Sequence, residues 1–143
     1  VYPMLYLSVF FEKYRSEYYD RLLAVSEKGE WEEWIKFFLR AVAVQSRDAV
    51  ENSKSILALL DKYRRVIQKQ RTSIYVFKLL EEVFLNPFVT VPYVAKRLET
   101  TYPTAKAAVE KLKEAKILCE VTDKRWGKIF CAKELLDLLE GKK

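Results

Sequence analysis

The segment from residue 30 to residue 71 constrains the fold most, because it contains neither glycine nor proline. Its glutamates gather in the first turn and its arginines and lysines gather near the end, which suits the dipole of a single helix. At 1.5 Å per residue, a helix of this length would reach roughly 60 Å. The sequence therefore predicts one long helix, with a break near Ser46 as the alternative.

Apolar residues along this segment recur at alternating three- and four-residue steps, the pattern of a coiled-coil seam. The members of this seam are Ile35, Phe38, Val42, Gln45, Ala49, Asn52, Ile56, Leu59, Tyr63 and Val66. Gln45 and Asn52 are polar interruptions. The seam is expected either to pair with a second copy, giving a homodimer through the long helix, or to pack on the preceding helix.

The preceding residues predict a shorter amphipathic helix from Ser8 to about Lys28, which Gly29 would end. Its apolar stripe is rich in aromatic residues and consists of Phe11, Tyr14, Tyr18, Leu22 and Val25. We expect this stripe to pack against a core. Residues 1–71 are therefore predicted to form a helical segment.

The pattern changes in residues 72–143, where short elements replace the long helix. Helices are expected over 73–85, 91–98 and 102–116, with Thr101 as the N-cap of the third and a proline in the first turn of the second and third. Two β-prone runs, 117–122 and 128–132, flank a loop, and a last helix covers 133–141. The predicted fold class is therefore mainly α: an N-terminal helical segment with a long helix, then a winged helix-turn-helix domain with a small β-hairpin.

The helix over residues 102–116 has the pattern of a recognition helix. Its inward positions are Ala105, Ala108, Val109 and Leu112, and these would cross over Val94, Ala95 and Leu98 of the preceding helix. The small alanines allow a close approach of the two helices. In helix-turn-helix domains, the N-terminal end of this helix enters the major groove of DNA.

The candidate nucleic-acid contacts lie on the recognition helix 102–116 and the wing 117–132. They are Tyr102, Thr104, Lys106, Lys111, Lys113, Lys124, Arg125, Trp126 and Lys128. Hydroxyl and ammonium groups can bond phosphates or base edges, and a basic loop with a tryptophan suits backbone or minor-groove contact. The alternative is that these lysines form an ordinary solvated face, because Glu110 and Glu114 lie among them, and that the domain docks a protein.

The remaining composition argues against an active site in this chain. There is no histidine, and the three glycines stand apart rather than forming a phosphate-binding loop. We therefore expect no catalytic residue, no cofactor and no metal site. The net charge of +6 permits a polyanionic partner, although basic and acidic residues divide evenly between the two halves.

The N-terminal apolar run and the two cysteines bear on the compartment. The run is too short to span a bilayer and lacks a basic leader, so we expect a cytoplasmic protein without membrane contact. Cys119 and Cys131 would lie opposite one another across the hairpin if Thr122 pairs with Lys128. They are interpreted either as two small buried hydrophobic residues or as a redox switch in the wing.

Several runs carry a resemblance to a known family. They are LYLS at Leu5–Ser8, EYYDRL at Glu17–Leu22, GEWEEWIKFFL at Gly29–Leu39, and the run from Val89 to Leu118. In order and spacing, the first three resemble the stretch that follows the catalytic motif in Fic-family (filamentation induced by cAMP) proteins. The last is similar to the winged-helix tail of the longer bacterial Fic proteins. The resemblance covers nearly the whole chain.

The resemblance implies a non-catalytic part of a larger enzyme. Fic enzymes transfer AMP from ATP to a hydroxyl of a target protein with an HPFxxGNGRxxR motif, which this sequence lacks. The family's autoinhibitory pattern is not matched either, because Leu136 stands where a hydroxyl residue would precede Glu140. The chain is thus expected to be the C-terminal DNA-binding or regulatory module of a protein adenylyltransferase, with the missing catalytic core as a partner. The alternative is a part of that enzyme that uses its winged helix for protein docking, substrate recruitment or dimerisation.

Overall fold

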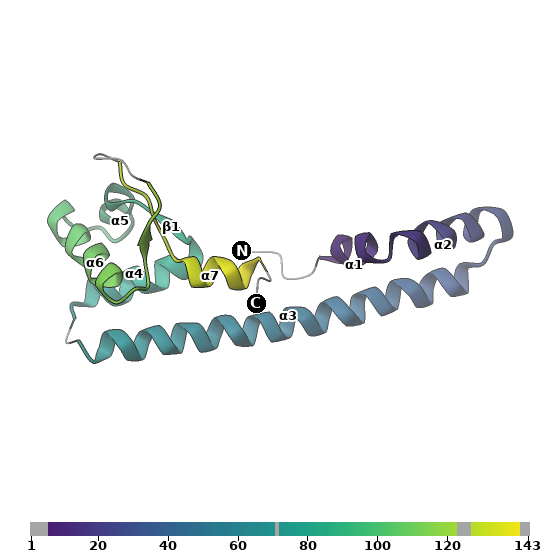
Figure 1. Ribbon diagram of the computed structural model, residues 1–143, viewed down its shortest axis with the longest axis horizontal. Coiled ribbons are helices and arrows are strands. Elements are labelled where there is room, and N and C mark those ends of the chain that lie inside the picture. Colours follow the sequence, from purple (N-terminus) through teal and green to yellow (C-terminus); the bar gives the residue numbers. More distant parts are fainter. Residues whose placement is uncertain (1–5, 71, 123–126, 141–143) are drawn as a thin grey trace. The chain divides into compact units, whose positions relative to one another are not determined.

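The computed structural model describes residues 6–70, 72–122 and 127–140. This part of the chain is mainly helical with one small antiparallel sheet, which confirms the mainly α class (Figure 1). The helices are α1 Leu7–Lys13, α2 Arg15–Lys28, α3 Trp31–Gln68, α4 Ile74–Leu85, α5 Val91–Arg97, α6 Tyr102–Glu114 and α7 Lys133–Leu139. The strands are β1 Phe88–Val89, β2 Cys119–Glu120 and β3 Phe130–Cys131.

The chain divides into two compact units, Val1–Ser53 and Lys54–Lys143. The division falls within α3, so the last turns of this helix belong to the second unit. Leu59, Tyr63 and Ile67 of α3 are buried in the core of that unit. The domains 1–71 and 72–143 are defined differently, by sequence pattern, and they stay a prediction.

The long helix is confirmed, because α3 runs without interruption from Trp31 to Gln68. The alternative break near Ser46 is wrong. Neither glycine nor proline occurs in this range, so each residue can contribute to a continuous ladder of backbone hydrogen bonds.

The single helix expected from Ser8 to Lys28 is wrong, because α1 and α2 meet at Tyr14. This residue has φ −111° and ψ 39°, outside the helical region. Its ring lies 4.5 Å from that of Phe10, and the guanidinium of Arg40 lies 5.2 Å from its centroid. Packing between the tyrosine, the phenylalanine and the arginine accompanies the break. Gly29 ends α2 as predicted, with φ 70° in the left-handed region.

The core of the first unit is small and aromatic. Phe10, Phe37 and Ala41 are buried, and the side chains packed against them are Leu7, Phe11, Tyr18, Trp34 and Val44. The α3 face used here is therefore not the predicted seam, since Ile35 is 51% exposed and Phe38 is 38% exposed. The face that packs is set by α1 and α2, which the spacing within α3 does not encode. Pairing of the seam with a second copy stays a prediction.

The second unit is built on α4, α5 and α6, which close over one continuous apolar core. The predicted cap at Thr101 is confirmed, because its hydroxyl accepts from the backbone N–H of Thr104 at 3.4 Å. Thr90, for which no cap is predicted, accepts in the same way from the backbone N–H of Tyr93 at 3.3 Å. These bonds satisfy donors that the first turn leaves open. The caps thus fix where α5 and α6 begin and how α6 is presented.

The sheet has the order β1-β3-β2 and is antiparallel throughout. Cys119 pairs with Cys131 and Glu120 with Phe130, which is the register expected for the hairpin. Strand β1 differs from the expectation, because the sequence predicts only a link between helices at residues 88–89. Two residues are too few to show the alternation that marks a strand. In the structure, β1 adds to the far edge of β3.

A polar contact fastens α7 to the last turns of α3 within the second unit. Glu134 accepts from Lys62 Nζ at 2.7 Å and from the Tyr63 hydroxyl at 2.8 Å. The hydrogen bond from Lys62 is the main cause that lowers the pKa of Glu134 below its ordinary value. The ionised carboxylate is therefore favoured in the folded state, and the contact stabilises the unit above the ordinary pKa of a glutamate.

Replacing Glu134 by glutamine is expected to remove a small, pH-dependent part of the stability. Because the folded-state pKa is lowered, this stability is present at pH 7 and is lost as the pH falls through that pKa. The side chains of Lys62 and Glu134 are about half exposed. The two proteins should therefore differ in free energy of unfolding by less than about 1 kcal/mol at pH 7. Thermal unfolding at pH 7 and pH 3 measures it. The two proteins should converge at pH 3, and a difference that persists there would contradict the assignment.

Candidate nucleic-acid interface

Helix α6 is held by the face that the sequence predicted. Ala105, Ala108, Val109 and Leu112 are all at most 2% exposed. Val94 of α5 is fully buried, and Ala95 and Leu98 pack against the same core. With this face buried, the opposite face of α6 points to solvent, and the candidate side chains lie on it.

The first turns of α6 carry three of the candidate residues. Tyr102 is 54% exposed, and Lys106 is exposed as well. Thr104 is half-buried as a residue, and its hydroxyl shares a hydrogen bond of 2.9 Å with that of Thr101. This threonine therefore belongs partly to the cap, whereas the tyrosine and the lysine are open to a partner.

A groove runs between α6, the start of α5 and the hairpin. Its volume is about 610 Å³, and it is lined by Val91, Pro92, Tyr102, Lys106, Glu110, Gly127, Lys128 and Phe130. Two ammonium groups and one carboxylate lie on its walls, so these side chains contribute one net positive charge. Apolar side chains and a tyrosine make up much of the remaining lining.

Most of the candidate lysines are already paired with carboxylates. Lys111 lies 2.7 Å from Glu114, and Lys128 lies 2.8 Å from Glu120. Lys113 lies 3.4 Å from Glu110 and 3.7 Å from Glu120. Glu120 on β2 therefore forms ion pairs both with Lys113 of α6 and with Lys128, which precedes β3. The hydrogen bond from Lys128 lowers the pKa of the Glu120 carboxyl.

Lys106 differs from these lysines, because it makes no ion pair with any residue that the structure describes. Its side chain lines the groove from the second turn of α6. A phosphate could bind there without first displacing a carboxylate. The remaining candidates, Lys124, Arg125 and Trp126, lie outside the described residues and stay predictions.

Sequence reasoning missed a buried carboxylate on α4. Glu82 is 7% exposed and accepts hydrogen bonds from the Tyr93 hydroxyl at 2.6 Å and from Arg97 Nε at 2.9 Å. The hydrogen bond that Arg97 donates to Glu82 is also the main cause that raises the pKa of Arg97. Its position next to Val83 in an apolar helix was the signal available in the sequence. The contact ties α4 to α5 and thereby sets the base on which α6 rests.

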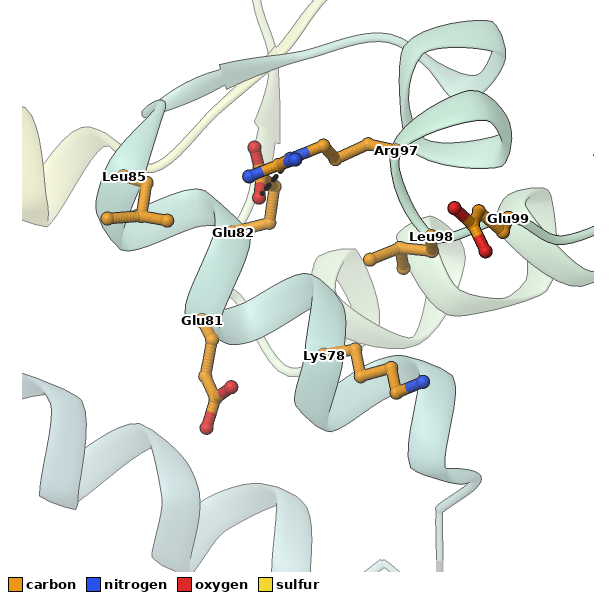
Figure 2. Close-up of a pocket in the computed structure, with 7 residues that line it drawn as sticks. All are labelled: Lys78, Glu81, Glu82, Leu85, Arg97, Leu98 and Glu99. Atoms are coloured by element: carbon orange, nitrogen blue, oxygen red, sulfur yellow. Dashed lines mark hydrogen bonds and ion pairs between the residues drawn. The ribbon is translucent and has the colours of Figure 1, made fainter.

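Figure 2 shows the hollow beside this contact, with Arg97 reaching from the end of α5 toward Glu82. The hollow has a volume of about 330 Å³ and is lined by Lys78, Glu81, Glu82, Leu85, Arg97, Leu98 and Glu99. Within it Glu82 pairs with Arg97, and Glu81 pairs with Arg64 of α3 at 3.2 Å. We assign this cluster a structural role.

Two further expectations concern metals and membranes. Among the described residues, no three histidine, cysteine, aspartate or glutamate side chains come together as metal ligands would. Across the same ranges, every helix is too short or too polar to cross a bilayer. No known protein-family model matches the chain.

Proposed function

We propose that the second unit is a winged helix-turn-helix module that binds duplex DNA, with residues 102–116 as the recognition helix and 117–132 as the wing. The observation that carries this proposal is Lys106, an exposed ammonium without an ion pair among the described residues, at the N-terminal half of α6 and on the wall of a groove. That half of a recognition helix is the part that meets base edges and phosphates.

The order and packing of the elements support the proposal. Helices α4, α5 and α6 are followed by a hairpin of β2 and β3, and a short strand after α4 completes the sheet. The turn between α5 and α6 spans few residues, as helix-turn-helix motifs require. A compact module of this kind can place a helix and a hairpin on neighbouring parts of one duplex.

The ion pairs around the groove set the expected strength of binding. Lys111, Lys113 and Lys128 must each exchange a carboxylate for a phosphate, so part of the attraction is offset. Lys106 needs no such exchange. We therefore expect modest affinity that rests mainly on phosphate contacts, and such affinity falls steeply as salt rises.

The resemblance to Fic-family proteins gives the module a context. We propose that it belongs to the C-terminal region of such a protein and regulates, recruits for or docks onto an adenylyltransferase core. The aromatic first unit fits this proposal, because Tyr19, Leu23 and Trp31 are each more than half exposed. An HPFxxGNGRxxR motif encoded upstream in the same gene would support the assignment, and a gene without that motif would oppose it.

Protein docking is the second candidate function. It is favoured by the groove lining, in which Pro92 and Tyr102 expose apolar surface beside paired charges, with the buried side chains of Val91 and Phe130 behind them. A peptide with an apolar anchor could use this surface without breaking the ion pairs of Lys111 and Lys113. In this case the module would recruit a target for the adenylyltransferase rather than bind DNA.

Fluorescence anisotropy of a labelled mixed-sequence duplex separates the two functions. The protein should raise the anisotropy at 50 mM salt and lose affinity steeply toward 200 mM, with log affinity falling linearly against log salt. A slope of about −3 would correspond to three or four phosphate contacts. Absence of binding at 50 mM salt would overturn the DNA proposal and favour the docking function.

A further inference from the structure

The two cysteines face one another across the base of the hairpin. Cys119 opens β2 and pairs directly with Cys131, which ends β3, and their sulfur atoms lie 3.5 Å apart. Two residues along, the N–H of Val121 donates to the carbonyl of Ile129 at 2.9 Å. Because pair types alternate along an antiparallel ladder, the cysteines form a hydrogen-bonded pair, in which Cα atoms lie about 5.5 Å apart.

This separation falls inside the range of about 4.4–6.8 Å between Cα atoms that disulfides use. The sulfur atoms need to approach by about 1.5 Å to reach a bond length near 2.05 Å. Rotation of the two side chains, together with a small approach of the two strands, can supply that movement while the strands stay paired. The backbone is therefore close to the arrangement that a bridge needs.

The two thiols differ in access. Cys119 is exposed, whereas Cys131, on the central strand β3, is buried. Burial, followed by the hydrogen bond with Cys119, raises the pKa of the Cys131 thiol to about 11. An oxidant from solvent thus meets Cys119 first, and Cys131 is held within reach but away from solvent.

We propose that Cys119 and Cys131 are a reversible redox site, in which Cys119 reacts with a peroxide and Cys131 resolves the product into an intramolecular disulfide. The Cys119 thiolate attacks one oxygen of hydrogen peroxide, the O–O bond breaks, and a sulfenic acid and one water result. The Cys131 sulfur then displaces the sulfenic hydroxyl, which leaves as a second water. Two thiols are oxidised, the peroxide takes up two electrons, and a thiol reductant reverses the reaction.

The bridge would act on the part of the hairpin that borders the groove. Glu120 and Phe130 lie next to the two cysteines in the ladder, and Glu120 anchors Lys113 and Lys128. A disulfide closes the loop between positions 119 and 131 at its base, which restricts the unfolded chain and holds the strands in register. This inference does not depend on whether the groove binds DNA or a protein.

Intact mass spectrometry of the reduced full chain, treated with an equimolar amount of hydrogen peroxide, tests the site. The expected product is a monomer that has lost two hydrogens and regains them with dithiothreitol. Its thermal midpoint should rise by on the order of 10 °C. Stable sulfenic or sulfinic acid on Cys119 in the wild type, or covalent dimers as the main product, would overturn the proposal.

Two single variants assign the roles. In Cys131→Ser, the exposed thiol should form a sulfenic acid that dimedone traps, since no resolving thiol remains. In Cys119→Ser, the buried thiol should react with peroxide at least tenfold more slowly than the wild type does. Equal rates in the wild type and Cys119→Ser would contradict Cys119 as the thiol that reacts first.

Discussion

Replacing Leu112 by alanine is expected to lower the free energy of unfolding of the second unit by about 3–4 kcal/mol. Leu112 is fully buried on the inner face of α6, where it packs into the core shared with α4 and α5. Removing its branched end loses transfer free energy and leaves a cavity beneath the helix. Urea unfolding followed by circular dichroism at 222 nm measures the loss.

The size of the effect can be set against the stability of the whole unit. A unit of this size commonly has a free energy of unfolding of roughly 5–13 kcal/mol. The variant should therefore remain folded without denaturant and unfold at a clearly lower urea concentration. We expect the packing of α6 to weaken most, because the cavity lies directly beneath this helix.

Leu85→Ala is the matched control for this change. The substitution removes the same atoms from a leucine that is 66% exposed and lies at the end of α4 (Figure 2). Its cost should stay within about 0.5 kcal/mol, as for other surface positions. If the two variants lost equal stability, the packing of α6 described here would be wrong.

Features fixed by neighbours in sequence were predicted well. Thr101 caps α6 as predicted, since a cap needs only a side-chain oxygen and the next few backbone N–H groups. The alanine face of α6 follows from helical spacing alone. The pairing of Cys119 with Cys131 follows from the length of the loop between two runs.

Features fixed by distant residues were missed. Glu82 is buried because Tyr93 and Arg97 reach it from another helix, and no local pattern in α4 announces those partners. The packed face of α3 in the first unit is chosen by Phe10 and its neighbours rather than by the heptad spacing. Strand β1 is a strand because β3 lies beside it.

The same distinction holds for the candidate interface. The sequence identified the exposed residues of α6, but it could not tell which lysines are available to a ligand. Glu120 forms ion pairs with Lys113 of α6 and with Lys128 of the hairpin. These ion pairs depend on the register of β2 against β3. Availability is a tertiary property, and it distinguishes Lys106 from the other candidate lysines of the described ranges.

Lys106→Glu is accordingly expected to weaken DNA binding more than any other single change among the described candidates. Each lost phosphate contact removes about 0.9 from the slope of log affinity against log salt. If the affinity gained from one phosphate contact vanishes near 1 M salt, losing the contact lowers the affinity roughly fifteenfold at 50 mM and about fivefold at 150 mM. The negative charge of the glutamate should lower it further. Anisotropy titrations at both salt concentrations measure the change.

Lys69→Glu provides a control of equal net charge. Lys69 lies just beyond the end of α3, in the same unit, and is not part of the groove lining. A general electrostatic effect would weaken binding equally in both variants, whereas a specific phosphate contact would affect the Lys106 variant far more. Circular dichroism should be unchanged in both, because each lysine is exposed. Equal affinities for the two variants would remove Lys106 from the interface and with it the observation on which the DNA proposal rests.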